Sequence, residues 1–96
     1  MKTLEEIKAT LRRHKPLLRE KFKVNQIGVF GSYAKGEESQ ASDVDILVEL
    51  NQPIGWEFVD LKEFLEEILG QGVDLVTVKA LRASLRGNIL KEVSYA

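Results

Sequence analysis

Two aspartates separated by one residue stand at the entrance of an apolar segment. Asp43 and Asp45 flank the first residue of VDILVEL, residues 44–50, and on an extended backbone their side chains leave the same face roughly 7 Å apart. Like charges at this spacing repel each other, and aspartate is a poor strand former. A divalent cation between them would turn the repulsion into ligation, and hard oxygen ligands suit magnesium. The pair therefore indicates a metal site, although an ordinary turn before a strand has the same pattern.

A third aspartate interrupts another apolar segment, VDLVTV, residues 73–78. Asp74 places a charge among valines and a leucine, and a buried charge is costly unless it is paired or bound to a metal. If this segment lies beside residues 44–50, three carboxylates converge at one sheet edge. Such a set suits two metal ions that clamp a phosphoryl or nucleotidyl displacement, with one carboxylate accepting the proton of the attacking hydroxyl. We therefore expect Asp43, Asp45 and Asp74 to be catalytic and metal-binding residues.

A glycine and a serine follow the apolar segment at residues 26–30. Gly31 would let the backbone approach a phosphate closely, while the hydroxyl of Ser32 and free N–H groups of the turn could donate to its oxygens. Lys35 is near enough in sequence to add a positive charge. A P-loop does not fit, because the residues after Gly31 and Gly36 differ from those that the motif requires. A calcium-binding loop does not fit either, because the residues after Asp43 and Asp45 differ from that motif. We expect Gly31, Ser32 and Lys35 to bind a phosphate-containing cofactor.

The periodicity of apolar residues predicts the elements that would position these turns. Thr3 and Glu6 have the spacing of a helix capping box. The expected elements are a helix over about residues 4–14, a short helix from Pro16 through Phe22, strands over 26–30, 44–50 and 73–78, a helix from Phe58 to Gly70 or Gly72, and a last helix over 81–93 despite Gly87. This order predicts an α/β domain in which helices cover a small sheet.

The aromatic residues and the single histidine carry less information. We expect Trp56, Phe58 and Phe64 to pack in the core or between helices rather than to stack on bases, with contact to a partner as a further use of Trp56. His14 is expected at a helix end or on the surface.

Length and composition indicate one small domain over residues 1–96. The chain has 96 residues and no cysteine, so an open surface cleft is expected rather than a large cavity, in a reducing compartment. No apolar run is long enough to span a membrane, and the N-terminus lacks the apolar stretch of a signal peptide. A cytoplasmic location is expected.

The net charge of −1 conceals an uneven distribution. Residues 1–23 carry eight basic and three acidic groups. Residues 37–67 carry one basic and ten acidic groups, and residues 79–96 carry four basic groups and one acidic group. The pattern fits solvated helix faces, and it equally fits an acidic, cation-binding centre between basic flanks that hold a polyanion. The basic run near the N-terminus lacks interleaved aromatic residues, so contact with RNA is possible but not favoured.

The spacing of the glycine–serine pair and the Asp-x-Asp pair is more specific than either motif alone. With the segments VFGSYAKGEESQASDVDILVEL and VDLVTVKALRASLRGNILKEV, the chain resembles the minimal nucleotidyltransferases (MNT) of the DNA polymerase β superfamily over nearly its whole length. The resemblance implies a mixed α/β nucleotidyltransferase fold and ATP and Mg²⁺ as cofactors. It also assigns the triphosphate to Gly31 and Ser32, both metals to Asp43 and Asp45, and the third carboxylate to Asp74. Many members of the family have arginine in place of Tyr33, so a cationic contact with phosphate would be either missing here or supplied by Lys35.

Stand-alone domains of this family are similar to the antitoxin half of pairs whose toxin is a HEPN ribonuclease. The implied activity is transfer of AMP from ATP to a tyrosine of the toxin. Two alternatives stay open: an antitoxin that neutralises its partner by binding alone, and nucleotidyl transfer to a small molecule or an RNA end.

Overall fold

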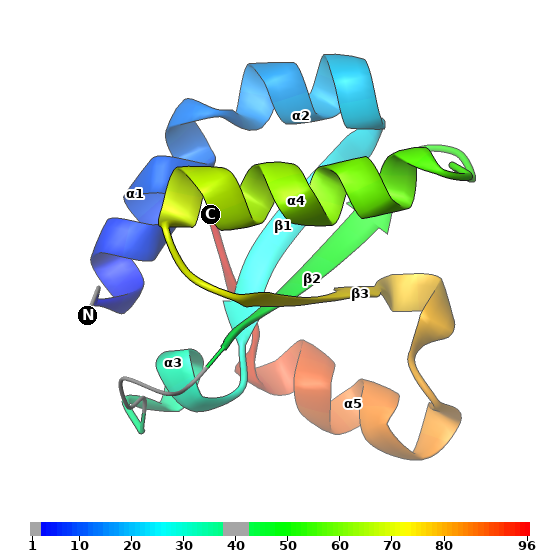
Figure 1. Cartoon of the computed structure of the whole chain (residues 1–96). Coiled ribbons are helices and arrows are strands. Elements are labelled where there is room, and N and C mark those ends of the chain that lie inside the picture. The colour runs from blue at the N-terminus through cyan, green and yellow to red at the C-terminus, as the bar shows by residue number, and fades with distance from the viewer. Residues whose placement is uncertain (1–2, 38–42) are drawn as a thin grey trace.

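A mixed four-stranded sheet forms the centre of the molecule (Figure 1). The computed structural model describes residues 3–37 and 43–96. The elements are α1 (Leu4–Arg13), α2 (Lys15–Phe22), β1 (Val24–Phe30), α3 (Ser32–Lys35), β2 (Val44–Leu50), α4 (Glu57–Leu69), β3 (Val73–Thr77), a 3₁₀ turn η1 (Val78–Ala80), α5 (Ala83–Glu92) and β4 (Ser94–Tyr95). In the strand order β3-β2-β1-β4, β2 runs parallel to β3, and β1 runs antiparallel to both β2 and β4. The expected α/β class with a small mixed sheet is confirmed.

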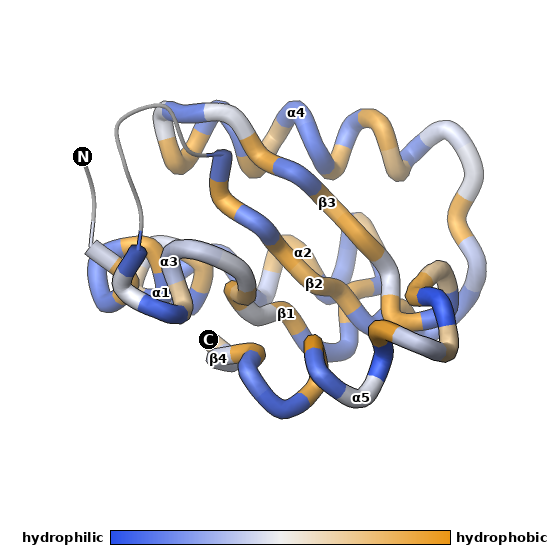
Figure 2. The backbone as a smooth tube through the Cα atoms, turned by 90° about the horizontal axis from the view of Figure 1, so that it is seen from below, coloured by the Kyte–Doolittle hydropathy of each residue, from blue (hydrophilic) through white to orange (hydrophobic). Residues whose placement is uncertain are grey.

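Helices α1, α2 and α4 cover one face of the sheet. Strand β2 alternates as the sequence predicts, with Val44, Ile46 and Val48 fully buried on that face. Figure 2 shows that β2 and β3 are hydrophobic through their middle parts, with a hydrophilic position near the start of each strand. The helices contribute Ile7, Leu11, Leu18, Phe22, Leu61, Leu65 and Leu69 to this core. Burial of these side chains fixes the register of β2, because a one-residue slip would turn the valines to solvent.

Local capping fixes the helix boundaries. The side chain of Thr3 accepts a hydrogen bond from the N–H of Glu6, and the Glu6 carboxylate accepts one from the N–H of Thr3, so the predicted capping box is confirmed. Helix α1 ends at His14, which bonds the carbonyl of Thr10 through Nδ1, as expected for a helix-end histidine. Gly70, with φ +71°, ends α4 in the left-handed region that glycine adopts without strain.

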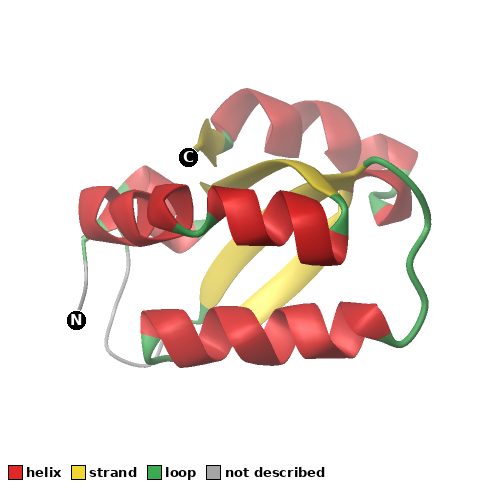
Figure 3. Cartoon of the chain, turned by 90° about the horizontal axis from the view of Figure 1, so that it is seen from above, coloured by secondary structure: helices red, strands yellow, loops and turns green. Residues whose placement is uncertain are grey.

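Helix α5 lies on the side of the sheet opposite α4 (Figure 3). It is shorter than the helix expected over residues 81–93, because the backbone is extended at Leu81 and Arg82 and again at Val93. The short strand β4, which the sequence did not predict, then pairs with Gly28 and Val29 of β1. Near the strand starts, Asp74 of β3 is exposed and Asp45 of β2 is half-buried.

One aromatic residue departs from its expected place. Trp56 is 87% exposed, so its interpretation as a core or packing residue is wrong, and its possible use in contact with a partner stays a prediction. Phe58 and Phe64 pack against the core as expected. Trp56 immediately precedes α4, where the apolar face of the helix has not yet begun.

Within the described ranges, no helix is long and apolar enough to cross a bilayer.

Candidate active site

The parallel pairing of β2 and β3 brings two of the three aspartates together. Asp45 and Asp74 are register partners across the two strands, and a hydrogen bond joins their carboxyl groups. Neighbouring strands are about 4.8 Å apart, and in-register side chains share one face. The structure therefore confirms that Asp45 and Asp74 converge at one edge of the sheet.

The environment of Asp45 disfavours its negative charge. Partial burial and the nearby charge of Asp74 are the main causes that raise the pKa of Asp45 from 3.8 to about 6, with smaller contributions from Asp43 and Glu92. A carboxyl group surrounded by like charges holds its proton more tightly. A cation or a phosphate-bound metal at this place would relieve the repulsion.

Asp74 itself is exposed, contrary to the expectation of a buried charge. Strand β3 lies at the edge of the sheet, and the face that carries Asp74 stays open to solvent. Because Asp74 is exposed, the cost of burying a charge gives no reason to expect a bound metal there. The carboxylate is nevertheless accessible to a substrate.

Asp43 precedes β2 and lies against Gly72, the residue before β3. A Cβ at Gly72 would collide with the Asp43 carboxylate, and Val44 N–H donates to the carbonyl of Gly72 at 2.9 Å. The negative charge of Asp43 contributes to the raised pKa of Asp45. The three carboxylates therefore share one end of the β2–β3 pair.

The turn after β1 lies directly against Asp45. Gly31 adopts φ +73° and ψ −147°, a conformation open to glycine almost alone, and a Cβ there would collide with the Asp45 carboxylate. Ser32 begins the short helix α3 immediately after it. The predicted phosphate-binding turn and the predicted metal-binding carboxylates are thus neighbours, because Phe30 of β1 pairs with Asp45 of β2.

Tyr33, for which the resemblance implied a possible cationic contact, belongs to the core in this chain. Tyr33 is 1% exposed, and its hydroxyl accepts a hydrogen bond from the side chain of Gln71. Lys35 is therefore the cation of α3 that lies near the turn.

A carboxylate that the sequence analysis missed completes the site. Glu92, the last residue of α5, accepts a hydrogen bond from the N–H of Gly31 at 3.2 Å, and its other oxygen lies 3.5 Å from Nζ of Lys35. No local motif reveals this contact, because 61 residues separate Glu92 from Gly31. The signal that the sequence offers for Glu92 is its position at the C-terminal end of a helix, where basic residues are preferred.

The carboxylates are chemically suited to bind a divalent cation, although their side chains do not form a preorganised coordination site in the described residues. In residues 3–37 and 43–96, no group of three or more His, Cys, Asp or Glu is arranged to hold a metal ion. The raised pKa of Asp45 shows that its charge lacks compensation, and carboxylate oxygens are the ligands that Mg²⁺ accepts. Asp43, Asp45 and Asp74 would be the candidate ligands of such an ion.

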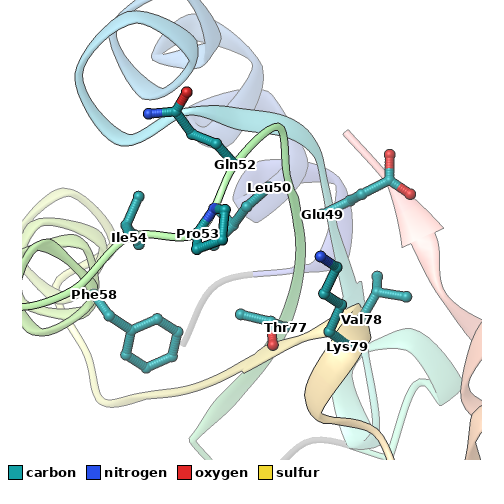
Figure 4. A pocket seen from close by; sticks show the side chains of 9 residues that line it. All are labelled: Glu49, Leu50, Gln52, Pro53, Ile54, Phe58, Thr77, Val78 and Lys79. Carbon is teal, nitrogen blue, oxygen red and sulfur yellow. The ribbon is translucent and has the colours of Figure 1, made fainter.

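A pocket of about 500 Å³ lies at the other end of the parallel strands (Figure 4). Leu50, Ile54 and Phe58 line it from β2, the following loop and α4, with Thr77 and Lys79 opposite. Asp45 and Asp74 stand near the starts of β2 and β3, whereas the pocket lies at their ends. The pocket is therefore not an extension of the carboxylate site.

Sequence comparison assigns this small mixed sheet, with its carboxylates beside a glycine–serine turn, to a class of nucleotide-transferring proteins. The family model described as nucleotidyltransferase domain matches residues 11–96. The chain belongs to this nucleotidyltransferase family.

Individual relatives place the chain among the minimal members. Protein adenylyltransferase MntA of Thermococcus cleftensis is 49% identical over 96 residues, which are 99% of this chain and 97% of that protein. A solved structure described as a minimal nucleotidyltransferase is 32% identical, with a TM-score of 0.83 over 97% of this chain and 95% of that chain. A toxin–antitoxin crystal structure with AMP-PNP is 26% identical, with a TM-score of 0.69 over 95% of this chain and 69% of that chain.

Proposed function

We propose that this nucleotidyltransferase is an antitoxin that transfers AMP from ATP to a tyrosine of a HEPN-type toxin with the help of Mg²⁺. The observation that carries the proposal is the contact of the Gly31 turn with Asp45, whose register partner is Asp74. This contact supports the proposal, because groups suited to phosphate oxygens lie beside Asp45, and we take its register partner Asp74 as the proton acceptor.

Two relatives support the nucleotide and the activity. The relative from Thermococcus cleftensis bears the name protein adenylyltransferase, and the toxin–antitoxin neighbour was solved with AMP-PNP, an analogue of ATP. The HEPN class of the partner and its tyrosine come from the resemblance of the sequence to the MNT family.

The chain's own residues account for the transfer step. The N–H of Gly31, the Ser32 hydroxyl and Lys35 hold the triphosphate, since backbone and hydroxyl donors with an ammonium suit phosphate oxygens. The tyrosine oxygen bonds to the α-phosphorus while the bond from that phosphorus to the bridging oxygen of the β-phosphate breaks, and pyrophosphate leaves. The phenol proton passes to the exposed carboxylate of Asp74. Asp43 and Asp45 lie beside this base and would hold a divalent cation there.

A divalent cation held by Asp43, Asp45 and Asp74 would supply charge stabilisation for the phosphates in the transition state.

The test uses two labelled forms of ATP. The purified chain is incubated with Mg²⁺ and the co-encoded partner, in one arm with ATP labelled on the α-phosphate and in the other with ATP labelled on the γ-phosphate. The proposal expects label on the partner from the α-position only, and mass spectrometry should locate AMP on tyrosine. Label from the γ-position would mean phosphoryl transfer.

The same assay separates the alternatives. A partner that binds the chain but acquires no label indicates neutralisation by contact, and label on RNA or on a small molecule indicates a different acceptor. Either result contradicts the proposed protein acceptor.

A further inference from the structure

Glu92 is bound to groups that we assign to the nucleotide. One oxygen accepts the N–H of Gly31 at 3.2 Å, and the other lies 3.5 Å from Nζ of Lys35. A carboxylate and a phosphate both favour backbone N–H donors and ammonium groups. The Glu92 side chain and an incoming triphosphate therefore compete for the same donor and the same cation.

The energetics of α5 alone disfavour an acid at this position. Glu92 is the last residue of the helix, where the aligned peptide dipoles concentrate negative charge and basic residues are stabilising. Its side chain is only 27% exposed. The contacts with Gly31 and Lys35 offset this penalty. These contacts, and not a stabilising effect on α5, therefore explain why an acid stands at this position.

Helix α5 depends on such contacts because it has little apolar attachment. None of its ten residues, all of which are described, is buried, and Leu85 and Leu90 are 51% and 39% exposed. Arg86 donates to the carbonyl of Val78 at 3.2 Å, near the start of the helix. Glu92 fastens the other end beside the candidate active site.

We infer that Glu92 occupies the phosphate-binding groups of the nucleotide-free protein and that the triphosphate replaces it there. The inference rests on the proposed function, because it takes Gly31 and Lys35 as phosphate-binding groups. Glu92 thereby weakens nucleotide binding, and its displacement releases the C-terminal end of α5. Glu92 is a positioning residue that couples the nucleotide to this helix.

Calorimetric titration of the full chain with ATP tests the competition. Glu92→Gln removes the charge and keeps the shape, Glu92→Ala removes both, and Glu63→Gln is the control because it removes one charge from an exposed residue of α4 on the other side of the sheet. An exposed ion pair and a charged hydrogen bond together predict roughly three- to tenfold tighter binding by both Glu92 variants. The control should match the wild type. Inorganic tripolyphosphate, titrated without metal, should give the same ranking.

A second readout follows the displaced contact directly in the wild type. Adding tripolyphosphate should shift the amide resonance of Gly31, and ATP should speed hydrogen exchange of the α5 amides. In Glu92→Ala the α5 amides should exchange rapidly without ATP and show little further increase.

Two results would overturn the inference in different ways. If the wild type binds ATP and the Glu92 variants bind it equally or more weakly, Glu92 is not a competitor and the proposed function stands. If neither the wild type nor the variants bind ATP or tripolyphosphate, both the inference and the proposed nucleotide site are wrong.

Discussion

Asp45 and Asp74 are like-charged register partners on neighbouring strands. Such pairs destabilise a sheet, and natural sequences keep them where function requires it. The sequence alone identified both residues, because aspartate is unusual in valine-rich strands. It overestimated the burial of Asp74, since the alternation of β3 does not reveal that this strand lies at the sheet edge.

Replacement of Asp74 should separate chemistry from binding. Asp74→Asn removes the proton acceptor and one metal ligand, and loss of a general base commonly slows a reaction by about 10²- to 10⁴-fold. Affinity for ATP should change little, because other groups hold the triphosphate. Single-turnover transfer and equilibrium ATP binding measure the two effects, with Asp60→Asn on the exposed side of α4 as control. Collapse of ATP affinity with a normal rate on bound substrate would refute the role.

The titration of Asp45 should appear in the pH dependence of stability without divalent cations. Burial and the charge of Asp74 raise the pKa of Asp45 from 3.8 to about 6, so the folded chain binds this proton more tightly than the unfolded chain does. The free energy of unfolding contributed by Asp45 should therefore fall as pH rises between about 4 and 6. Thermal melts of the wild type and of Asp45→Asn over this range check it, since the variant should lack that part of the decline. Parallel profiles for the two proteins would show that Asp45 titrates normally.

At the scale of elements, the turn between β1 and α3 is the most constrained part of the site. Its geometry depends on Gly31, which has positive φ and leaves no space for a Cβ beside Asp45. The sequence predicted this turn from the glycine–serine pair at residues 31 and 32.

Two glycine substitutions should have different effects. Gly31→Ala forces a strained backbone and displaces Asp45, so it should cost about 1–3 kcal/mol of stability and abolish transfer. Gly72→Ala meets only the exposed side chain of Asp43, which can rotate away, so transfer should fall while stability changes little. Denaturant unfolding and the labelled transfer assay measure both properties. Equal stability of the two variants would contradict the assigned constraint at Gly31.

Other elements show what sequence patterns do not contain. The alternation at residues 44–50 and the capping box at Thr3 are local signals, and both predictions are confirmed. Strand β4 has two residues and exists because β1 offers a free edge. The contact of Glu92 with Gly31 likewise depends on where α5 ends in space, so neither feature could be read from neighbouring residues.

At the scale of the whole molecule, the site is an open surface at one end of the sheet. In the part of the chain that the structure describes, Asp74 is exposed and Asp45 is half-buried, so water reaches the place where an acceptor would lie. The proposed toxin would have to cover that place. Its orientation of the tyrosine could contribute several kcal/mol to lowering the barrier, on the order of the advantage of intramolecular reactions.

The partner should therefore accelerate transfer, and salt should weaken the effect. We expect pyrophosphate release from ATP and Mg²⁺ to rise by orders of magnitude when the partner is added. The acidic centre and its basic flanks carry the charge asymmetry seen in the sequence, so complex formation should become weaker as ionic strength rises. A salt series with and without the partner measures both. Equal rates in the two arms would indicate a self-sufficient nucleotidyltransferase.

The central claim is that these carboxylates neutralise the partner by catalysis rather than by contact. The most direct measurement compares the wild type with the double variant Asp43→Asn, Asp45→Asn for AMP on the partner, ribonuclease activity of the partner, and formation of the complex, all in the same samples with ATP and Mg²⁺. The variant should fold as stably as the wild type or slightly more so, because like-charge repulsion is removed. We expect both proteins to bind the partner, and the wild type alone to add AMP to tyrosine and to silence the ribonuclease. Silencing by the variant without AMP, or AMP transfer by the variant, would contradict it.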